Sequence, residues 1–221
     1  MRWWERRSLL LGSLVAYPRF MAGIFDIVCS FLRRARFFLK SLAYSGVGRD
    51  RWQQPDRVIA ELDLRAGDRV ADLGAGAGYF TFRLAEAVRP SGVVYAVDTD
   101  PDMPSALANR AFHKELDNVV AVEANPEDPG LPEAVKVVFL ANTYHHIPDP
   151  AAYFARLGRY LRPGGRIAVI EALPIGLHRV FGHATDAHKV RSTLADAGYT
   201  CVENHGFLAR QSFQLFERTA D

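Results

Sequence analysis

The sequence predicts an α/β fold, a three-layer α/β/α sandwich in which a seven-stranded, mainly parallel sheet lies between two layers of helices. Three observations support this prediction. Strand and helix signals alternate from Trp52 to the end of the chain, as they do in parallel sheets whose strands are joined by crossover helices. The first strand runs into a glycine-rich turn. The last two strand signals have the period-2 pattern of a sheet edge.

The predicted elements follow one another without internal repeats. The expected strands cover residues 69–73, 92–97, 118–123, 137–141, 166–171, 200–203 and 213–218. The expected helices cover residues 55–64, 80–88, 103–116, 151–161 and 188–197. In sheets of this kind ligands bind beyond the carboxyl ends of the parallel strands, so functional residues are expected at those ends.

Composition divides the chain into an extension and one domain. The 221 residues are enough for one domain of ordinary size with an appendage. Residues 1–51 contain ten Lys and Arg against three Asp and Glu, whereas the rest of the chain contains 17 against 22. We therefore expect a basic helical extension over residues 1–47 and a globular domain over residues 48–221.

The extension has an amphipathic pattern. Winding residues 20–42 as a helix gathers the large apolar side chains on one face and most Lys and Arg on the other, which is typical of a helix lying in a membrane interface. Residues 8–42 thus predict peripheral membrane contact, with a helix that packs on the domain or caps its site as the alternative. A membrane span is less favoured, because the uncharged run Ser8–Pro18 has 11 residues where a span needs about 20.

The glycine-rich turn is the most specific signal in the chain. After the strand at 69–73 the sequence reads Asp72-Leu73-Gly74-Ala75-Gly76-Ala77-Gly78-Tyr79. Glycines at such a turn let the backbone bend tightly and approach a ligand. The G-x-G-x-x-G pattern of nicotinamide dinucleotide sites would need a third glycine at Tyr79. The G-x-G-x-G pattern with Asp72 two residues before it resembles the class I S-adenosylmethionine-dependent methyltransferases.

The resemblance covers the chain from about Gly48 to its C-terminus. Within the class, this part of the chain is similar in particular to the quinone-biosynthesis (type 11) C-methyltransferases. It implies a Rossmann-like fold that binds S-adenosylmethionine and releases S-adenosylhomocysteine. In that family the glycine loop lies against the methionine portion of the cofactor, and the acid at the position of Asp72 helps orient its amino group. The expected cofactor-binding residues are Asp72, Gly74, Ala75, Gly76, Gly78, Tyr79, Asp98, Thr99, Asn125, Asn142 and Trp52.

Other strand ends fit the same site. Asp98 ends an apolar strand 20 residues after Gly78, where a carboxylate can accept hydrogen bonds from both ribose hydroxyls. Asn125 follows the third strand, at a position where the family commonly has an Asp that contacts the adenine ring. Trp52 either closes the cofactor pocket by stacking or contact with the sulfonium, or anchors the core.

The segment after the fourth strand carries the candidate catalytic residues. It contains Tyr144-His145-His146-Ile147-Pro148-Asp149, similar to an HHI-x-D stretch of the same family. His145, His146 or Tyr144 could accept a proton from the methyl acceptor, because histidine titrates near neutral pH; alternatively a histidine only orients the loop. Glu171 ends the fifth strand facing the site and is expected to contact the substrate. The turn at 161–165, which reads L-x-P-G-G in the family, is expected to be structural.

Other classes of site have little support. Cys29 and Cys201 form no redox or metal-ligand pattern, and His178, His183 and His188 have no usual metal spacing. No metal is expected, and arsenite methylation, which similar enzymes perform with thiols, is disfavoured. Nucleic-acid binding is also disfavoured, because the basic residues of the extension are interleaved with apolar ones.

The prediction is therefore a cytoplasmic methyltransferase acting on a small molecule, at the inner face of the membrane if the extension binds lipid. A lipid-soluble acceptor, such as a quinone precursor or a phospholipid head group, suits that extension. Two alternatives remain: a cofactor-binding protein without turnover that is recruited to membrane or a partner, and, less favoured, a nicotinamide-dependent oxidoreductase. The sequence does not indicate the oligomeric state.

Overall fold

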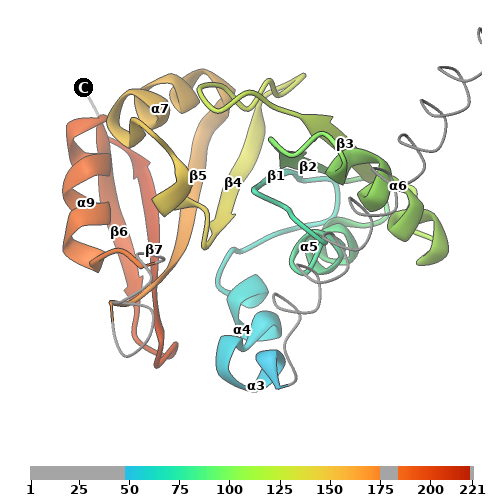
Figure 1. Ribbon diagram of the computed structural model, residues 1–221, viewed down its shortest axis with the longest axis horizontal. Coiled ribbons are helices and arrows are strands. Elements are labelled where there is room, and N and C mark those ends of the chain that lie inside the picture. Colours follow the sequence, from blue (N-terminus) through green and yellow to red (C-terminus); the bar gives the residue numbers. More distant parts are fainter. Residues whose placement is uncertain (1–47, 175–183, 220–221) are drawn as a thin grey trace, which may run out of the picture. The chain divides into compact units, whose positions relative to one another are not determined.

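The computed structural model describes residues 48–174 and 184–219, and these build one seven-stranded sheet (Figure 1). The strands are β1 (Arg69–Leu73), β2 (Val93–Asp98), β3 (Val119–Glu123), β4 (Val135–Ala141), β5 (Leu161–Ala172), β6 (Tyr199–His205) and β7 (Gln211–Arg218). Their order is β3-β2-β1-β4-β5-β7-β6. Strands β1 to β5 are parallel, and β7 runs antiparallel between β5 and β6. The predicted mainly parallel sheet is confirmed.

Helices cover both faces of this sheet (Figure 1). They are α3 (Arg49–Gln53), α4 (Pro55–Ala60), α5 (Thr81–Val88), α6 (Met103–His113), α7 (Pro150–Leu157) and α9 (Ala187–Asp196), with 3-10 turns η1 (Tyr144–His146) and η2 (Gly158–Tyr160). The strand side chains alternate between two buried clusters, as Val137 and Val138 of β4 do. One cluster includes Leu84 of α5, and the other includes Phe154 of α7. The structure is thus the predicted three-layer sandwich.

Some boundaries differ from the sequence predictions. The helix expected at 55–64 is shorter and is separated from α3 by Gln54, whose backbone is left-handed with φ 45°. The fifth strand begins earlier than expected, at Leu161, because that residue pairs with Val135 of β4 across the sheet. This pairing draws the L-x-P-G-G turn into the strand, with Gly164 at φ 70°. Neither feature has a local sequence signal.

The basic extension lies outside the described residues. The chain divides after Gly46 into two units, and the sheet belongs to the second, Val47–Asp221. The predicted membrane contact through residues 8–42 therefore stays a prediction, as do the helical extension at 1–47 and the boundary at Gly48. His178 and His183 also fall outside the described residues. No helix in the ranges 48–174 and 184–219 is long and apolar enough to cross a membrane.

Candidate functional site

The glycine loop leaves the carboxyl end of β1, between β2 and β4. Gly74, Gly76 and Gly78 all have positive φ, at 73°, 52° and 82°. A Cβ on Gly74 would lie 2.3 Å from Thr143 Oγ1, and one on Gly78 would lie 2.5 Å from the ring of Phe82. Both conformation and close approach therefore require glycine at these positions, and the loop presents bare backbone at the carboxyl edge of the sheet.

Asp98 lies beside this loop at the end of β2. Its Oδ2 accepts a hydrogen bond from the Gly76 amide at 2.8 Å, and its Oδ1 accepts one from the Asp100 amide at 3.0 Å. The loop is tied to the same strand by the amides of Gly74 and Ala75, which donate to Val97 O at 2.8 and 3.0 Å. The structure thus brings the first and second predicted cofactor motifs together, with the exposed Thr99 directly after Asp98.

Asp72 is a buried carboxyl group beneath the loop. It is 3% exposed, and its Oδ2 accepts a hydrogen bond from Thr81 Oγ1 at 2.6 Å. Burial raises the pKa of Asp72 to about 7, and the charge of Asp98 adds to that rise, while the Thr81 hydroxyl and Arg49 oppose it. A cation bound at the loop would favour the ionised form of this carboxyl group.

Helix α3 holds the last residue of the glycine motif. The Arg49 guanidinium lies 3.6 Å from the centre of the Tyr79 ring, and the Tyr79 hydroxyl donates to Asp50 Oδ1 at 2.5 Å. Arg83 of α5 pairs with the same aspartate at 3.2 Å and donates to Tyr79 O at 2.8 Å. Burial and Asp50 raise the pKa of Tyr79. Sequence reasoning placed this segment near the pocket but missed Arg49 and Asp50, which have no motif of their own.

Trp52 and Asn125 lie nearer the surface. Trp52 on α3 is half-buried, with the Arg210 guanidinium 5.9 Å from its ring centre, so both expected roles stay open. Asn125 is exposed, and its Oδ1 accepts from the Glu127 amide at 2.9 Å. The residue before it, Ala124, donates its amide to Asp98 O at 2.9 Å, which keeps this segment beside the end of β2.

The segment after β4 is fixed to three neighbouring strands. Asn142 has φ 56°, and its amide donates to Ile170 O of β5 at 2.8 Å. Its side-chain Oδ1 accepts from Gln211 Nε2 of β7 at 2.8 Å. Thr143 Oγ1 donates to Leu73 O of β1 at 3.0 Å. Sequence reasoning missed Thr143 and Gln211, because their roles depend on contacts about 70 residues apart, as the separation between Asn142 and Gln211 shows.

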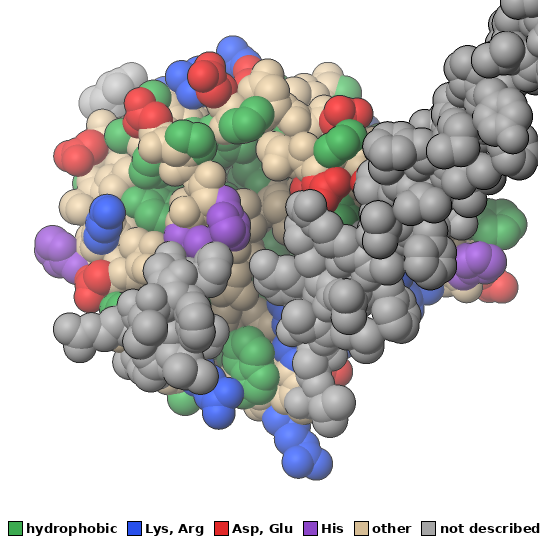
Figure 2. Space-filling model, viewed as in Figure 1, with side chains coloured by type: hydrophobic (Ala, Val, Ile, Leu, Met, Phe, Trp, Pro, Cys, Tyr) green, Lys and Arg blue, Asp and Glu red, His purple; other side chains and the backbone are tan. Residues whose placement is uncertain are grey.

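His145 and Glu171 form a close pair at the ends of β4 and β5. Nδ1 of His145 lies 2.7 Å from Oε1 of Glu171, and the side chains are 9% and 0% exposed. Oε1 also accepts the Ala172 amide at 3.2 Å, and no described residue hydrogen-bonds Oε2. The exposed His146 has its ring centre 4.0 Å from that of His145. Histidine side chains gather near the middle of the face shown in Figure 2.

Tyr144 has a different environment from its two histidine neighbours. Its side chain is 3% exposed, its ring stacks on Phe154 with centres 5.9 Å apart, and its hydroxyl donates to Thr193 Oγ1 of α9 at 2.9 Å. Burial raises the pKa of Tyr144. Successive residues of a 3-10 turn point in different directions. This turn directs Tyr144 into the core below α9, His145 toward the buried Glu171 and His146 to the surface.

The chain is similar to known methyltransferases. Residues 64–206 match the model of a methyltransferase domain family. The chain is 33% identical over 142 residues to 27-O-demethylrifamycin SV methyltransferase of Amycolatopsis mediterranei, covering 62% of this chain and 49% of the relative. It is 29% identical over 153 residues to arsenite methyltransferase of Halobacterium salinarum, covering 63% of this chain and 39% of the relative. The chain therefore spans half or less of these relatives.

A solved structure agrees in fold. A SAM-dependent methyltransferase from Aquifex aeolicus superposes with a TM-score of 0.74 at 24% identity, covering 80% of this chain and 96% of that one. The match to the family model spans the glycine loop, Asp98 and the end of β4, where the sequence analysis placed the cofactor. The chain belongs to the methyltransferase-domain family, among the class I S-adenosylmethionine-dependent methyltransferases.

Proposed function

We propose that this protein transfers the methyl group of S-adenosylmethionine to a small organic acceptor that gives up a proton in the reaction. The observation that carries the proposal is the His145–Glu171 pair, which lies at the same edge of the sheet as the glycine loop. The link between them is short, since Thr143, two residues before His145, packs against Gly74 and donates to β1.

The residues of the loop fit the cofactor. Thr143 and Phe82 occupy the places that a Cβ on Gly74 or Gly78 would take, whereas a Cβ on Gly76 would have no neighbour closer than 3.9 Å, so the backbone of the loop is open at Gly76. Asp98 would hold the ribose and Asp72 the amino group, with Asn125 near the adenine, as the family resemblance implies. S-adenosylmethionine supplies an electrophilic methyl group when it is bound there. Positioning the methyl donor and the acceptor for reaction can lower the activation barrier by about 7–11 kcal/mol.

His145 acts as the base in this proposal. Donation of its Nδ1 proton to the buried Glu171 fixes the ring and makes Nε2 the basic nitrogen. Nε2 would take the proton that the acceptor loses when it receives the methyl group, the sulfur–methyl bond of the cofactor being the one that breaks, and Glu171 would stabilise the resulting imidazolium. Glu171 thus acts through His145 as a positioning residue. Tyr144 is not assigned a proton-transfer role, because its hydroxyl donates to Thr193.

The acceptor class is inferred from the site and the extension. The two relatives named above act on a rifamycin and on arsenite by their names. Arsenite suits this chain poorly, because Cys201, whose pKa is raised by burial, is the single cysteine among the described residues. His145 as a base suits an organic acceptor with an acidic O–H or C–H, such as a quinone precursor. The apolar, positively charged extension suits a lipid-soluble acceptor of that kind or a phospholipid head group. We place the enzyme in the cytoplasm, at the inner membrane face when residues 8–42 bind lipid.

The test begins with calorimetric titration of the full chain with S-adenosylhomocysteine, followed by transfer of radiolabelled methyl groups. The acceptors offered are phenolic quinone precursors and anionic phospholipid vesicles. His145→Gln should abolish transfer while leaving cofactor affinity unchanged, and Tyr144→Phe, the matched control, should retain both. Cofactor binding by the unchanged protein without transfer to any acceptor would favour the non-catalytic binding protein. If His145→Gln loses transfer because it no longer binds the cofactor, the assignment of His145 as the base is contradicted.

A further inference from the structure

A second cluster of chemically capable side chains lies on the opposite face of the sheet from the His145–Glu171 pair. Glu61 follows α4, and Glu203 and His205 lie on the edge strand β6. His205 pairs across the sheet with Phe213, which pairs with Ile170, the residue before Glu171. Successive strand residues point to opposite faces, so the cluster is separate from the methyl-transfer site. We call Glu61, Glu203 and His205 the Glu-His-Glu cluster.

A bulge in β6 turns two members of the cluster toward α4. Cys201 pairs with Phe216, which belongs to the core beneath α7 and α9. The register then shifts, and Glu203 pairs with Leu215, which belongs to the core on the α4 side. A bulge inserts one residue and reverses the face that later residues occupy. Without the shift, Glu203 and His205 would share the face of Cys201 and could not meet Glu61.

The three side chains converge closely. His205 Nδ1 lies 3.8 Å from Glu61 Oε2, and His205 Nε2 lies 3.3 Å from Glu203 Oε2. One ligand atom from each residue can be chosen so that all three lie within 4.8 Å of one another. The imidazole is packed between aromatic rings, with centres 4.7 Å from Phe213 and 5.8 Å from Phe207. Its position is therefore fixed by the core.

His205 Nε2 supplies a separate indication. This atom is buried and has no hydrogen-bond partner among the described residues, although Glu203 Oε2 is 3.3 Å away. The carboxylate is thus close enough for a hydrogen bond but not aligned for one. Buried polar atoms in proteins nearly always have a partner, and an unmatched one indicates a missing water or ion. A cation bound by Nε2 and the Glu203 carboxylate would give this nitrogen its partner, and Glu61, whose Oε2 lies 3.8 Å from Nδ1, would join them by moving toward the Nε2 side of the ring.

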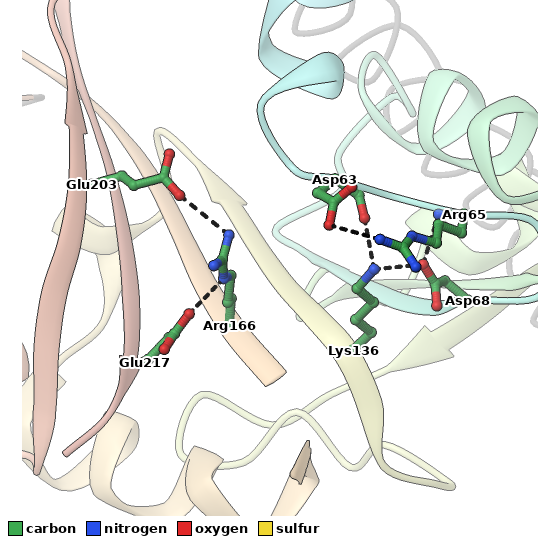
Figure 3. Close-up of polar contacts among 7 residues, drawn as sticks. All are labelled: Asp63, Arg65, Asp68, Lys136, Arg166, Glu203 and Glu217. Carbon is green, nitrogen blue, oxygen red and sulfur yellow. Dashed lines mark hydrogen bonds and ion pairs between the residues drawn. The ribbon is translucent and has the colours of Figure 1, made fainter. Parts of the chain in front are cut away.

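Arg166 of β5 orients the carboxylate of Glu203. Arg166 Nη1 lies 3.2 Å from Glu203 Oε1, and Arg166 Nε lies 2.7 Å from Glu217 Oε1 (Figure 3). The guanidinium engages one oxygen of Glu203 and leaves the other directed at His205. Glu217 offsets the charge of Arg166, and the guanidinium that pairs with Glu61 among the described residues is that of Arg57, at 4.0 Å. Three carboxylates therefore meet two guanidinium groups, and the balance favours a cation.

Other charged clusters of the domain lack this character. At the amino end of β4, Lys136 Nζ contacts Asp68 Oδ2 at 3.0 Å and Asp63 O at 2.6 Å, and Arg65 lies 3.7 Å from Asp63 (Figure 3). That group already contains its own cations and no histidine. Only the Glu-His-Glu cluster, among the described residues, combines metal-ligand types at this spacing.

We propose that Glu61, Glu203 and His205 bind one divalent transition-metal ion, with zinc as the best fit. An imidazole nitrogen and carboxylate oxygens suit zinc, whereas magnesium and calcium prefer oxygen ligands alone. Zinc holds such ligands at about 2.0–2.2 Å, so neighbouring ligand atoms in a tetrahedral site lie about 3.4 Å apart. The glutamates are 34% and 39% exposed, which lets them close in and lets water complete the coordination.

The ion would tie α4 to the edge of the sheet. The links already present include a hydrogen bond from Gln54 Nε2, at the start of α4, to Phe207 O at 2.9 Å, and the Arg57 guanidinium, 4.1 Å from the centre of the Phe207 ring. A ligand that binds only the folded chain stabilises it in proportion to the logarithm of its concentration over Kd. Zinc should therefore raise the melting temperature of the protein in the absence of cofactor, an effect that is independent of methyl transfer.

The test uses the full chain after treatment with EDTA and dialysis. Zinc is titrated by calorimetry, and cobalt(II) by visible absorption, which reports tetrahedral coordination. We expect one ion per chain, a higher melting temperature, and at least tenfold weaker binding in each of Glu61→Gln, Glu203→Gln and His205→Gln. Matched controls remove groups outside the cluster: Glu86→Gln on α5 and His188→Gln on α9 should bind as the unchanged protein does.

Each other outcome counts against the site. No zinc binding at millimolar concentration overturns it, and so does binding that survives Glu61→Gln or Glu203→Gln. Competition by magnesium at equal concentration overturns the assignment to a transition metal. If His205→Gln fails to fold by circular dichroism, the two glutamate variants, which alter partly exposed groups, decide the matter. Because no readout involves the cofactor, failure here leaves the proposed methyl transfer untouched.

Discussion

Replacing Asp72 with asparagine removes a buried titrating group beneath the glycine loop and should change how stability depends on pH. The carboxyl group is 3% exposed, and burial raises its pKa from 3.8 to about 7 in the folded protein. In the unfolded chain it titrates near the ordinary value. Between about pH 4 and pH 7 the folded protein therefore keeps a proton that the unfolded chain has released.

The sign of the effect follows from that difference. Where the folded state binds more protons, the free energy of unfolding falls as the pH rises. The slope is about 1.4 kcal/mol per pH unit, so a window of about three units amounts to about 4 kcal/mol. The asparagine side chain of the variant cannot ionise, so this part of the fall should be absent from it. The amide that replaces one oxygen adds a cost of about 1–3 kcal/mol that does not vary with pH.

The assay is urea unfolding of both proteins without cofactor from pH 4.5 to pH 8. We expect the stability of the variant relative to the unchanged protein to rise by about 3 kcal/mol across that range. Asp117→Asn is the control for loss of one negative charge, because that side chain is 89% exposed. Parallel stability curves for the unchanged protein and Asp72→Asn would refute the reasoning.

Three further predictions concern the loop and the base. S-adenosylhomocysteine should bind about tenfold more weakly at pH 6 than at pH 8, because the role that we propose for ionised Asp72 is to pair with the ammonium group of this ligand. Calorimetry of Asp72→Asn should show no such change. Gly78→Ala should lower the free energy of unfolding by about 3 kcal/mol, since φ is 82° and the new Cβ meets the ring of Phe82 at 2.5 Å. Gly130→Ala, at φ 62° with open space around the Cβ, should lower it by about 1 kcal/mol, and urea unfolding measures both. Equal costs would exclude the clash as the cause. Glu171→Gln should lower kcat about 100-fold with little change in KM and alter the pH–rate profile; a changed KM with kcat intact would instead indicate the substrate contact expected from the sequence.

The sequence alone determined the fold class and which strand ends carry the residues that we propose for the cofactor. Both depend on short local patterns: apolar strands, a glycine turn with positive φ angles that are unfavourable for other residues, and acidic residues at strand ends. Gly74, Gly78 and Asp98 lie where those patterns predict, because a parallel sheet brings the carboxyl ends of its strands to one edge. The order of the last strands was not predictable in the same way, since β7 lies between β5 and β6 through pairings that no local signal encodes.

Only the tertiary structure decided which side chains act together. His145 and Glu171 are 26 residues apart and meet because β4 and β5 are neighbours. Tyr144, equally eligible by sequence, is buried because the turn directs it toward Thr193. His205 meets Glu61 because a bulge reverses the face of β6. Local residue patterns determine where strands, turns and helices form. Which side chains meet depends on which strands are neighbours and on which face of the sheet each residue lies, and the packing of the whole sheet sets both.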